Sequence, residues 1–331
     1  MADDYFVTCR SVNGDGTFGG DPDVVRYLVV PQGAAQPLAA HQNPSTGPVA
    51  TRGTRWARGL LDGLPPSQNG RDRNILFLVH GFNVDPQGAL ESHHKVVDGL
   101  ARAGWSGRVV SFDWPSKGTP AAYLDDRVDV RTTANLLVSS AIQLFVTMTA
   151  ARAASDQPCD VAVHVLAHSM GAYLVREAFN HADDDKPARD ATWQVNQLAF
   201  ISGDISSGCM SAGNAMTRGL YGHAGRITNY SNAFDGALQV SNVKRAFTAP
   251  RVGRVGLPDD APDVACNVEA GDVWRPLATG GPGDIVHSHT FWFECDPFFK
   301  DLKLTLDGHI DRNAMPTRTP IKPNRLTLKP A

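Results

Sequence analysis

Short apolar runs alternate along the chain with longer stretches in which apolar positions recur at helical spacing. The runs at residues 74–79, 108–113, 161–166, 195–201, 225–230 and 264–268 predict buried strands. Helical spacing or helix-start residues predict helices over residues 86–103, 125–154, 170–179, 206–220, from about 235, and 297–306. This alternation predicts βαβ crossovers and a mostly parallel central sheet with helices on both faces.

The two ends of the chain have a different pattern. Residues 1–50 carry short apolar runs at 5–8 and 24–30 between Gly, Asp and Pro clusters, which predicts two or three strands at a sheet edge. Residues 51–73 have the composition of a loop. The segment 309–331 is polar and contains four prolines, so we expect an unstructured C-terminal tail. The prediction is therefore one α/β domain over residues 1–308, followed by this tail.

Composition and charge narrow the classes of protein. With 331 residues, 42% of them hydrophobic, the chain is long enough for one large α/β core. The net charge is −3 and no Lys or Arg run is long, so we do not expect a nucleic-acid partner. There is no apolar run of about 20 residues and no signal sequence, which predicts a soluble, cytoplasmic protein without a transmembrane segment. The five cysteines form no C-x-x-C pair and are expected to be free thiols rather than zinc ligands.

The strongest chemical signal is the sequence Ala-His-Ser-Met-Gly at residues 167–171. It is the G-x-S-x-G pattern with Ala167 in place of the first glycine, and it stands between a predicted strand and a predicted helix, as a nucleophile elbow requires. A serine on such a turn is exposed above the sheet and faces the positive end of the following helix. Serine is also common as an ordinary helix cap, which is the alternative explanation for Ser169.

A serine nucleophile needs two backbone N–H groups directed at the oxygen that becomes negative in the tetrahedral intermediate. One typically belongs to the residue after the nucleophile and the other to a loop that follows an earlier strand. The loop His-Gly-Phe-Asn at residues 80–83 follows such a strand. We therefore predict an oxyanion hole formed by Met170 and Phe82.

The serine also needs a base, and histidine titrates in the useful range. In the α/β arrangement that carries this elbow, the acid follows the serine and the histidine comes last. His287 and His289 lie after the last predicted strand and before the closing helix, whereas His223 comes too early and His309 lies beyond that helix. Either His287 or His289 therefore fits the role of base.

The order leaves two aspartates as the acid. Asp235 follows the strand that ends at residue 230, and Asp204 follows the preceding strand. An aspartate before a helix is also a common N-cap, so position alone does not decide between them. His168, beside the serine, is expected at the start of the helix and directed away from the cleft. His164 and Trp114 are expected in the core.

Three segments together resemble the α/β-hydrolase superfamily: Leu-Phe-Leu-Val-His-Gly-Phe-Asn-Val at 76–84, Phe-Asp-Trp-Pro-Ser at 112–116 and Val-Leu-Ala-His-Ser-Met-Gly at 165–171. Within the superfamily they are similar to a mainly bacterial branch catalogued as a domain of unknown function, number nine hundred. That branch has an H-G-[FY]-N loop, a W-P-S segment and an A-H-S-M-G elbow. The resemblance covers roughly residues 5–305. It implies an α/β-hydrolase fold.

The resemblance also implies a role for single residues. It makes Ser169 the nucleophile and Asp235 the acid, because the residues from 230 to 238 are similar to the family's strand-end segment. It makes His289 the base, because His289 and the aromatic residue that follows resemble a His-Ser-aromatic segment before the last helix. The gap from this histidine to Pro297 differs slightly from the family's, so His287 stays the alternative.

From these observations we expect a serine hydrolase, foremost a carboxylic-ester hydrolase acting on a small-molecule or lipid-like ester, with no metal or organic cofactor. The alternatives are cleavage of an amide or peptide bond by the same triad, and a non-catalytic binding or scaffold protein with a hydrolase fold. Insertions at about 206–222 and 238–262 fall between strands on the ligand side. We expect them to form a cap over Ser169, with Leu220 and Tyr221 in its wall.

Overall fold

The computed structural model describes residues 3–42, 49–64, 74–116, 130, 133–138, 161–184, 188, 190, 193–243, 249–308 and 311–330. Their strands are β1 (Asp4–Val12), β2 (Phe18–Val30), β3 (Asn74–Val79), β4 (Arg108–Asp113), β5 (Ala162–His168), β6 (Val195–Ile201), β7 (Ala224–Ser231), β8 (Ala265–Glu269), β9 (Arg318–Lys322) and β10 (Arg325–Leu328). They form one ten-stranded sheet in the order β2-β1-β4-β3-β5-β6-β7-β8-β10-β9.

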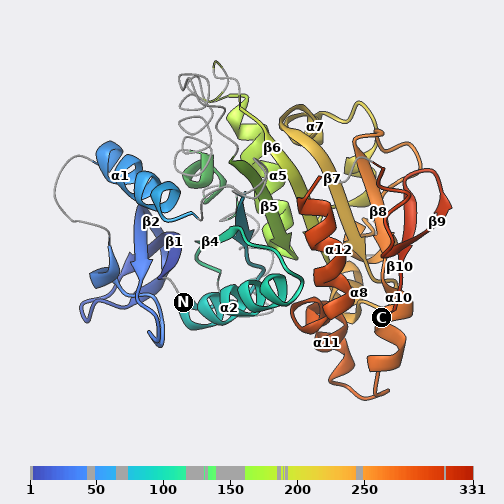
Figure 1. Ribbon diagram of the computed structural model, residues 1–331, viewed down its shortest axis with the longest axis horizontal. Coiled ribbons are helices and arrows are strands. Elements are labelled where there is room, and N and C mark those ends of the chain that lie inside the picture. Colours follow the sequence, from blue (N-terminus) through green and yellow to red (C-terminus); the bar gives the residue numbers. More distant parts are fainter. Residues whose placement is uncertain are drawn as a thin grey trace.

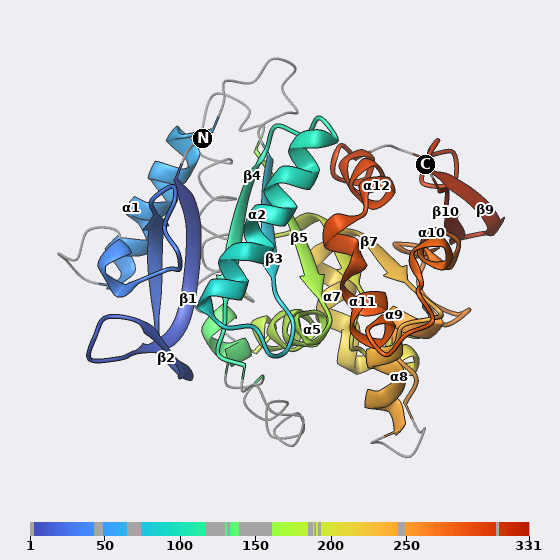
Figure 2. The same cartoon turned by 90° about the horizontal axis from the view of Figure 1, so that it is seen from below.

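The sheet is parallel from β1 through β10 and becomes antiparallel only where β2 and β9 add the two edges. Figures 1 and 2 show the β1–β2 hairpin at one end of the molecule and β9 and β10 at the other. This arrangement confirms the predicted α/β fold with a mostly parallel sheet and N-terminal edge strands. The carboxyl ends of the parallel strands share one edge of the sheet, and that edge is where a ligand site is expected.

The described α-helices are α1 (Val49–Asp62), α2 (Pro86–Arg102), α5 (Met170–Ala182), α7 (Arg218–His223), α8 (Gly236–Val243), α9 (Val252–Val255), α10 (Gly271–Trp274), α11 (Asp284–Thr290) and α12 (Asp296–Leu306). Short 3-10 turns are η1 (Ala39–His41), η3 (Ser207–Met210), η4 (Ala215–Thr217), η5 (Arg275–Leu277) and η6 (Phe291–Glu294). Asp85 caps α2 by accepting a hydrogen bond from Gly88 N at 2.7 Å, and Pro86 occupies the first turn, as the sequence predicts.

Both faces of the sheet are covered by helices. Side chains alternate along β3, so that Ile75, Phe77 and Val79 join a core with α1 and α5, while Leu76 and Leu78 join a core with α2 and α12. All six residues of β3 are buried. A strand buried on both faces is continuously apolar, which is why this run was readable in the sequence.

Two parts of the prediction are wrong, namely the loop at residues 51–73 and the unstructured C-terminal tail. Helix α1 occupies much of the segment predicted as a loop. Its apolar residues are interspersed with three arginines and two glycines, which made the segment resemble a loop, but Trp56 and Leu60 are fully buried and Trp56 Nε1 donates a hydrogen bond to Leu28 O at 2.9 Å. The expected helix over 125–154 lies mostly outside the described residues, of which 130 and 133–138 are helical.

The predicted unstructured tail instead adds β9 and β10 to the sheet, so β8 is not the last strand. Leu326 and Leu328 are buried with α12, and Arg318 enters the core, where its guanidinium donates to Asp301 Oδ2 at 2.7 Å. The prolines obscured this segment in the sequence. Pro320 lies in the edge strand β9, where a missing N–H does not interrupt a central ladder.

Candidate active site

Ser169 stands on a sharp turn between β5 and α5. Its φ is 55°, which is unusual for a residue other than glycine, and its backbone N–H donates to Ile201 O of the neighbouring strand at 3.1 Å. Strand β5 ends at His168 and α5 begins at Met170, so one residue makes the whole change of direction. Such strain at a strand-to-helix turn is the geometry of a nucleophile elbow.

Small residues let the elbow and the loop after β3 approach closely. A Cβ at Gly171 would lie 2.4 Å from His80 O, and a Cβ at Gly81 would lie 2.9 Å from Ser169 Cβ. The last glycine of the elbow pattern is therefore required by contact with the loop at residues 80–84. Phe82, in this loop, lines the same cavity as Ser169, and Met170 is the first residue of α5, where backbone N–H groups have no intrahelical partner.

The structure brings Ser169, His289 and Asp235 into one hydrogen-bonded chain. Ser169 Oγ donates to His289 Nε2 at 2.8 Å, and His289 Nδ1 donates to Asp235 Oδ2 at 2.8 Å. These distances are those at which a base takes a serine proton and a carboxylate orients the imidazole. Asp235 is fully buried. Its other oxygen, Oδ1, accepts from Leu238 N at 2.9 Å, so the residue is both the cap of α8 and the partner of the histidine.

Helix α11 carries His289 and is fixed to the end of β7 by its neighbour Ser288. Asn232 Nδ2 donates to Ser288 O at 2.9 Å, and Gly236 N donates to Ser288 Oγ at 3.0 Å. A Cβ at Gly236 would lie 2.9 Å from Ile285 Cα, so α8 and α11 pack closely. The imidazole is thus held by its own helix as well as by its hydrogen bonds to Ser169 and Asp235.

The pKa of His289 reflects opposing effects. Burial lowers it, but the charge and hydrogen bond of Asp235, and the charge of Asp204, together hold the pKa above the ordinary histidine value. A raised pKa means that the protonated imidazole is stabilised where it forms. A histidine that acts as a general base becomes an imidazolium during the reaction, and the raised pKa stabilises that form.

The alternative residues have other partners. Asp204 forms a buried ion pair with Arg251, whose Nε lies 2.8 Å from Asp204 Oδ1, although Asp204 also lines the cavity. His287 packs edge-on against Trp274, with 5.1 Å between ring centroids. His223 contacts Asp183 away from the site, and His309 lies outside the described residues. The geometry thus favours Asp235 and His289 over these alternatives.

His168 differs from its prediction. It was expected to face away from the cleft, but it lines the cavity, and its Nε2 donates to His289 O at 3.1 Å. Burial, and to a lesser degree His289, lower the pKa of His168 to about 3, so the ring is neutral and acts as a fixed donor. It contributes a further anchor for α11. His164 and Trp114 are buried, as predicted.

A cavity of about 660 Å³ opens beside Ser169 and has two unlike walls. One wall, from α8 and α11, is apolar and includes Leu238, Val240, Ile285 and Val286. The other, from α2 and η6, carries Glu91, Ser92, Lys95, Glu294 and also Phe293. A concave site of this size with an apolar wall beside polar groups is typical of small-molecule binding.

The two insertions expected to cap the site are placed differently. Among the described residues that line the cavity, Leu238 and Val240 come from the segment 238–262, but none comes from 206–222. Leu220 is fully buried beside α5, and Tyr221 donates to Met210 O at 2.6 Å. The segment 238–262 therefore contributes to the apolar wall through α8, and the rest of that wall comes from α11, which the sequence pattern did not reveal as a helix.

Within the part of the chain that the structure describes, no group of three or more His, Cys, Asp or Glu side chains is arranged to hold a metal ion. The described cysteines are free thiols. Over the same residues, no helix has both the length and the apolar character needed to span a bilayer.

The family model described as "Alpha/beta hydrolase of unknown function (DUF900)" matches residues 67–269, which is more than half of the chain. The chain belongs to this family. The match includes β3 through β8, and with them Ser169 and Asp235, while β1, β2 and His289 lie outside it. No curated protein matches the chain.

Solved structures similar to this α/β hydrolase include an esterase, a cutinase-like protein and a lipase. An inhibited esterase B from Lactobacillus rhamnosis has 11% identity and a TM-score of 0.39, covering 74% of this chain and 79% of that one. A cutinase-like protein from Cryptococcus sp. has 12% identity and a TM-score of 0.38, covering 73% and 98%. Lipase B of Aspergillus fumigatus has 16% identity and a TM-score of 0.28, covering 68% and 47%. The fold assignment rests on the sheet and on the family match.

Proposed function

We propose that the protein hydrolyses carboxylic esters through an acyl-enzyme intermediate, with Ser169 as nucleophile, His289 as base and Asp235 as its carboxylate. One observation carries the proposal. Ser169 Oγ, the His289 imidazole and the Asp235 carboxylate form a continuous chain with both hydrogen bonds at 2.8 Å. Ser169 and His289 line a cavity in an α/β hydrolase, and Asp235 is buried behind the histidine.

In acylation, Ser169 Oγ attacks the ester carbonyl carbon while His289 Nε2 takes the serine proton. The carbonyl oxygen becomes negative and accepts hydrogen bonds from the backbone N–H groups of Phe82 and Met170. Asp235 stabilises the imidazolium and keeps the proton on Nδ1, which leaves Nε2 free to accept. Collapse of the intermediate breaks the bond to the alcohol oxygen, and His289 returns the proton to that oxygen.

In deacylation, water replaces the alcohol. His289 Nε2 takes a proton from water as the water oxygen attacks the acyl carbon, and the same N–H groups bind the second oxyanion. When this intermediate collapses, His289 returns the proton to Ser169 Oγ and the carboxylic acid leaves. The cycle consumes one water and needs no group beyond the side chains and backbone already named.

The lining of the cavity supports an ester with a hydrocarbon portion. Leu238, Ile285 and Val286 form an apolar wall from α8 and α11, against which an alkyl or aryl group is removed from water. Each buried methylene contributes about 0.8 kcal/mol. A chain of several carbons therefore gains enough binding energy to be distinguished from acetate.

The test is hydrolysis of a series of p-nitrophenyl esters by the purified protein, compared with Ser169→Ala. The hydroxyl contributes no core volume, so the variant is expected to keep its circular dichroism and unfolding temperature. Its kcat should fall by at least about 10³-fold, because the oxyanion hole alone leaves only residual catalysis. A variant that keeps more than about a tenth of the wild-type kcat would refute the role of Ser169. A parallel series of p-nitroanilides distinguishes esters from amides as the preferred class.

A further inference from the structure

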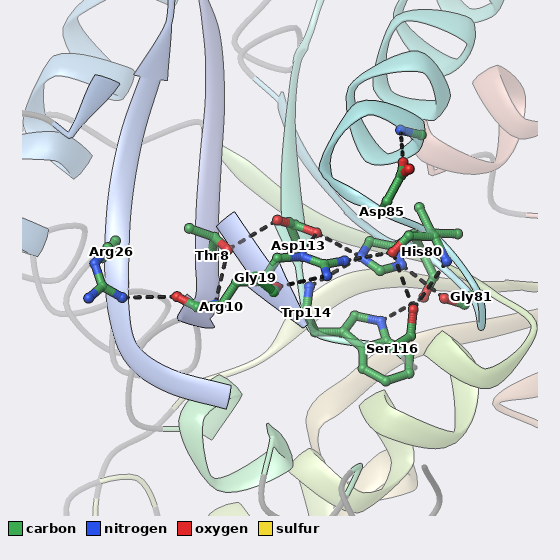
Figure 3. Close-up of polar contacts among 12 residues, drawn as sticks. Thr8, Arg10, Gly19, Arg26, His80, Gly81, Asp85, Asp113, Trp114 and Ser116 are labelled. Carbon is green, nitrogen blue, oxygen red and sulfur yellow. Dashed lines mark hydrogen bonds and ion pairs between the residues drawn. The ribbon is translucent and has the colours of Figure 1, made fainter. Parts of the chain in front are cut away.

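The loop at residues 80–84 holds one of the two proposed oxyanion donors, and polar contacts from two other segments surround it (Figure 3). Asp113 is the last residue of β4, and Trp114 and Ser116 follow it; all three belong to the Asp-Trp-Pro-Ser motif, which the triad leaves unexplained. Arg10 comes from β1, outside the residues that the family model matches. These residues contact the backbone of the loop and the side chain of His80, its first residue.

Residues that follow β4 form hydrogen bonds with backbone groups at both ends of the loop. Trp114 Nε1 donates to His80 O at 2.9 Å. Ser116 Oγ accepts from Val84 N at 3.1 Å and lies 3.3 Å from Val84 O, to which it donates. Within the loop, His80 Nδ1 donates to Gly81 O at 2.9 Å. Both ends of the loop are therefore anchored to the segment that follows β4.

Arg10 joins these contacts from β1, the strand beside β4 in the sheet. Its Nε donates to Asp113 Oδ1 at 2.7 Å and its Nη2 donates to Val84 O at 2.6 Å. Asp113 Oδ1 also lies 3.1 Å from His80 Nε2, and Thr8 Oγ1 donates to Asp113 Oδ2 at 3.1 Å. Arg10 and Asp113 are 2% and 0% exposed, so these charges have little access to water and their geometry is fixed.

The other side of the loop rests on the nucleophile elbow. Gly81 packs against Ser169, and His80 O lies where any side chain at Gly171 would fall. The loop is thus confined between the elbow on one side and the Arg10–Asp113 pair on the other. A displacement on the Arg10 side moves the loop relative to Ser169 and changes the direction of its N–H groups.

We propose that Arg10 is a positioning residue for catalysis, which acts through Asp113 and Val84 to fix the oxyanion loop against Ser169. This inference rests on the proposed ester hydrolysis and adds to it a requirement for the N-terminal hairpin. The guanidinium suits the task because its planar fork reaches the Asp113 carboxylate and the Val84 carbonyl at the same time. A lysine ammonium keeps the charge beside Asp113 but cannot span both groups.

The test measures kcat, KM and inhibition by an alkyl boronic acid for Arg10→Lys with a p-nitrophenyl ester. The boronic acid forms a tetrahedral adduct with serine and therefore reports on the oxyanion hole directly. Oxyanion contacts strengthen in the transition state, so we expect kcat to fall about 10- to 100-fold with KM within about threefold. The inhibition constant of the boronic acid should rise by a similar factor.

The matched control is Arg318→Lys, at the fully buried Arg318–Asp301 pair near the other edge of the sheet. A general loss of packing would affect both variants alike, whereas a positioning role predicts that Arg318→Lys keeps kcat and boronic-acid inhibition within about twofold. If Arg10→Lys does not fold, Ser116→Ala takes its place. That variant removes only the hydroxyl anchor of Val84, and we expect kcat about 3- to 10-fold lower.

The outcomes separate the two proposals. Suppose that the wild-type protein hydrolyses the ester and that Arg10→Lys, or its substitute Ser116→Ala, has the same kcat as the Arg318→Lys control. This result would overturn the positioning role and leave the proposed function intact. A wild-type protein that hydrolyses no ester and binds no boronic acid would refute the proposed function and, with it, this inference.

Discussion

Replacing Asp235 with asparagine separates its two roles, because each carboxylate oxygen has its own partner. Oδ1 accepts from Leu238 N and caps α8, while Oδ2 accepts from His289 Nδ1. The asparagine oxygen can keep the cap, so stability should change by less than the roughly 1 kcal/mol that loss of a cap costs. The amide nitrogen then faces Nδ1 as a donor, which favours the imidazole tautomer that cannot accept the serine proton.

We therefore expect Asp235→Asn to lower kcat by about 10³- to 10⁴-fold, or roughly 4 to 5.5 kcal/mol of transition-state stabilisation, with a nearly unchanged unfolding midpoint. The assay combines ester hydrolysis with urea unfolding. Asp204→Asn is the matched control: it alters the other carboxylate near His289, which has Arg251 as its ion-pair partner, and should reduce kcat far less. A larger loss of kcat in Asp204→Asn than in Asp235→Asn would refute the assignment of the acid.

The remaining predictions concern pH, specificity and stability. Because the pKa of His289 is raised and the base must be neutral, kcat/KM should fall on the acid side with an apparent pKa above about 6.5. In Asp235→Asn this acid limb should move to lower pH, and a limb that stays in place would count against the pairing of His289 with Asp235. Leu238→Ala removes part of the apolar wall and enlarges the cavity, so it should change the ratio of kcat/KM for octanoate over butanoate esters by about 10-fold. The buried Leu220→Ala should lower stability and leave this ratio unchanged; equal ratios in both variants would contradict the placement of the wall. Arg318→Met leaves the buried Asp301 carboxylate without its cation and should lower the free energy of urea unfolding by about 3 to 5 kcal/mol. Arg102→Met, at an exposed ion pair, should lower it by less than about 1 kcal/mol. A loss within about 1 kcal/mol for Arg318→Met would mean that the C-terminal strands are not part of the stable core.

Local patterns were enough to predict the central sheet and the positions that follow its strands. The run at β3 is apolar because it is buried on both faces, and the elbow around Ser169 is a local feature with a fixed context. The order of residues along the chain then placed Asp235 and His289 as candidates. Their contact spans 54 residues, and residue order alone did not distinguish it from a pairing with Asp204 or His287, whereas the family resemblance favoured Asp235 and His289.

Features that depend on contacts between distant segments were not predictable in this way. Arg10 has no local signal, since its role arises only when β1 pairs beside β4 and brings Thr8 opposite Asp113. The C-terminal strands were obscured by prolines, and their burial depends on Arg318 reaching Asp301. Helix α11 spans only seven residues and is held by contacts with Asn232, Gly236 and His168 rather than by its own periodicity.

The central claim is that Ser169 is a nucleophile activated by His289, and covalent labelling tests it without knowledge of the natural substrate. The protein would be incubated with an alkyl fluorophosphonate, its intact mass measured, and the labelled peptide sequenced by mass spectrometry. We predict one adduct per chain, located on Ser169, with labelling slowed by at least about 10²-fold in His289→Ala and abolished in Ser169→Ala. An unlabelled wild-type protein, or a label on another residue that persists in Ser169→Ala, would contradict the account.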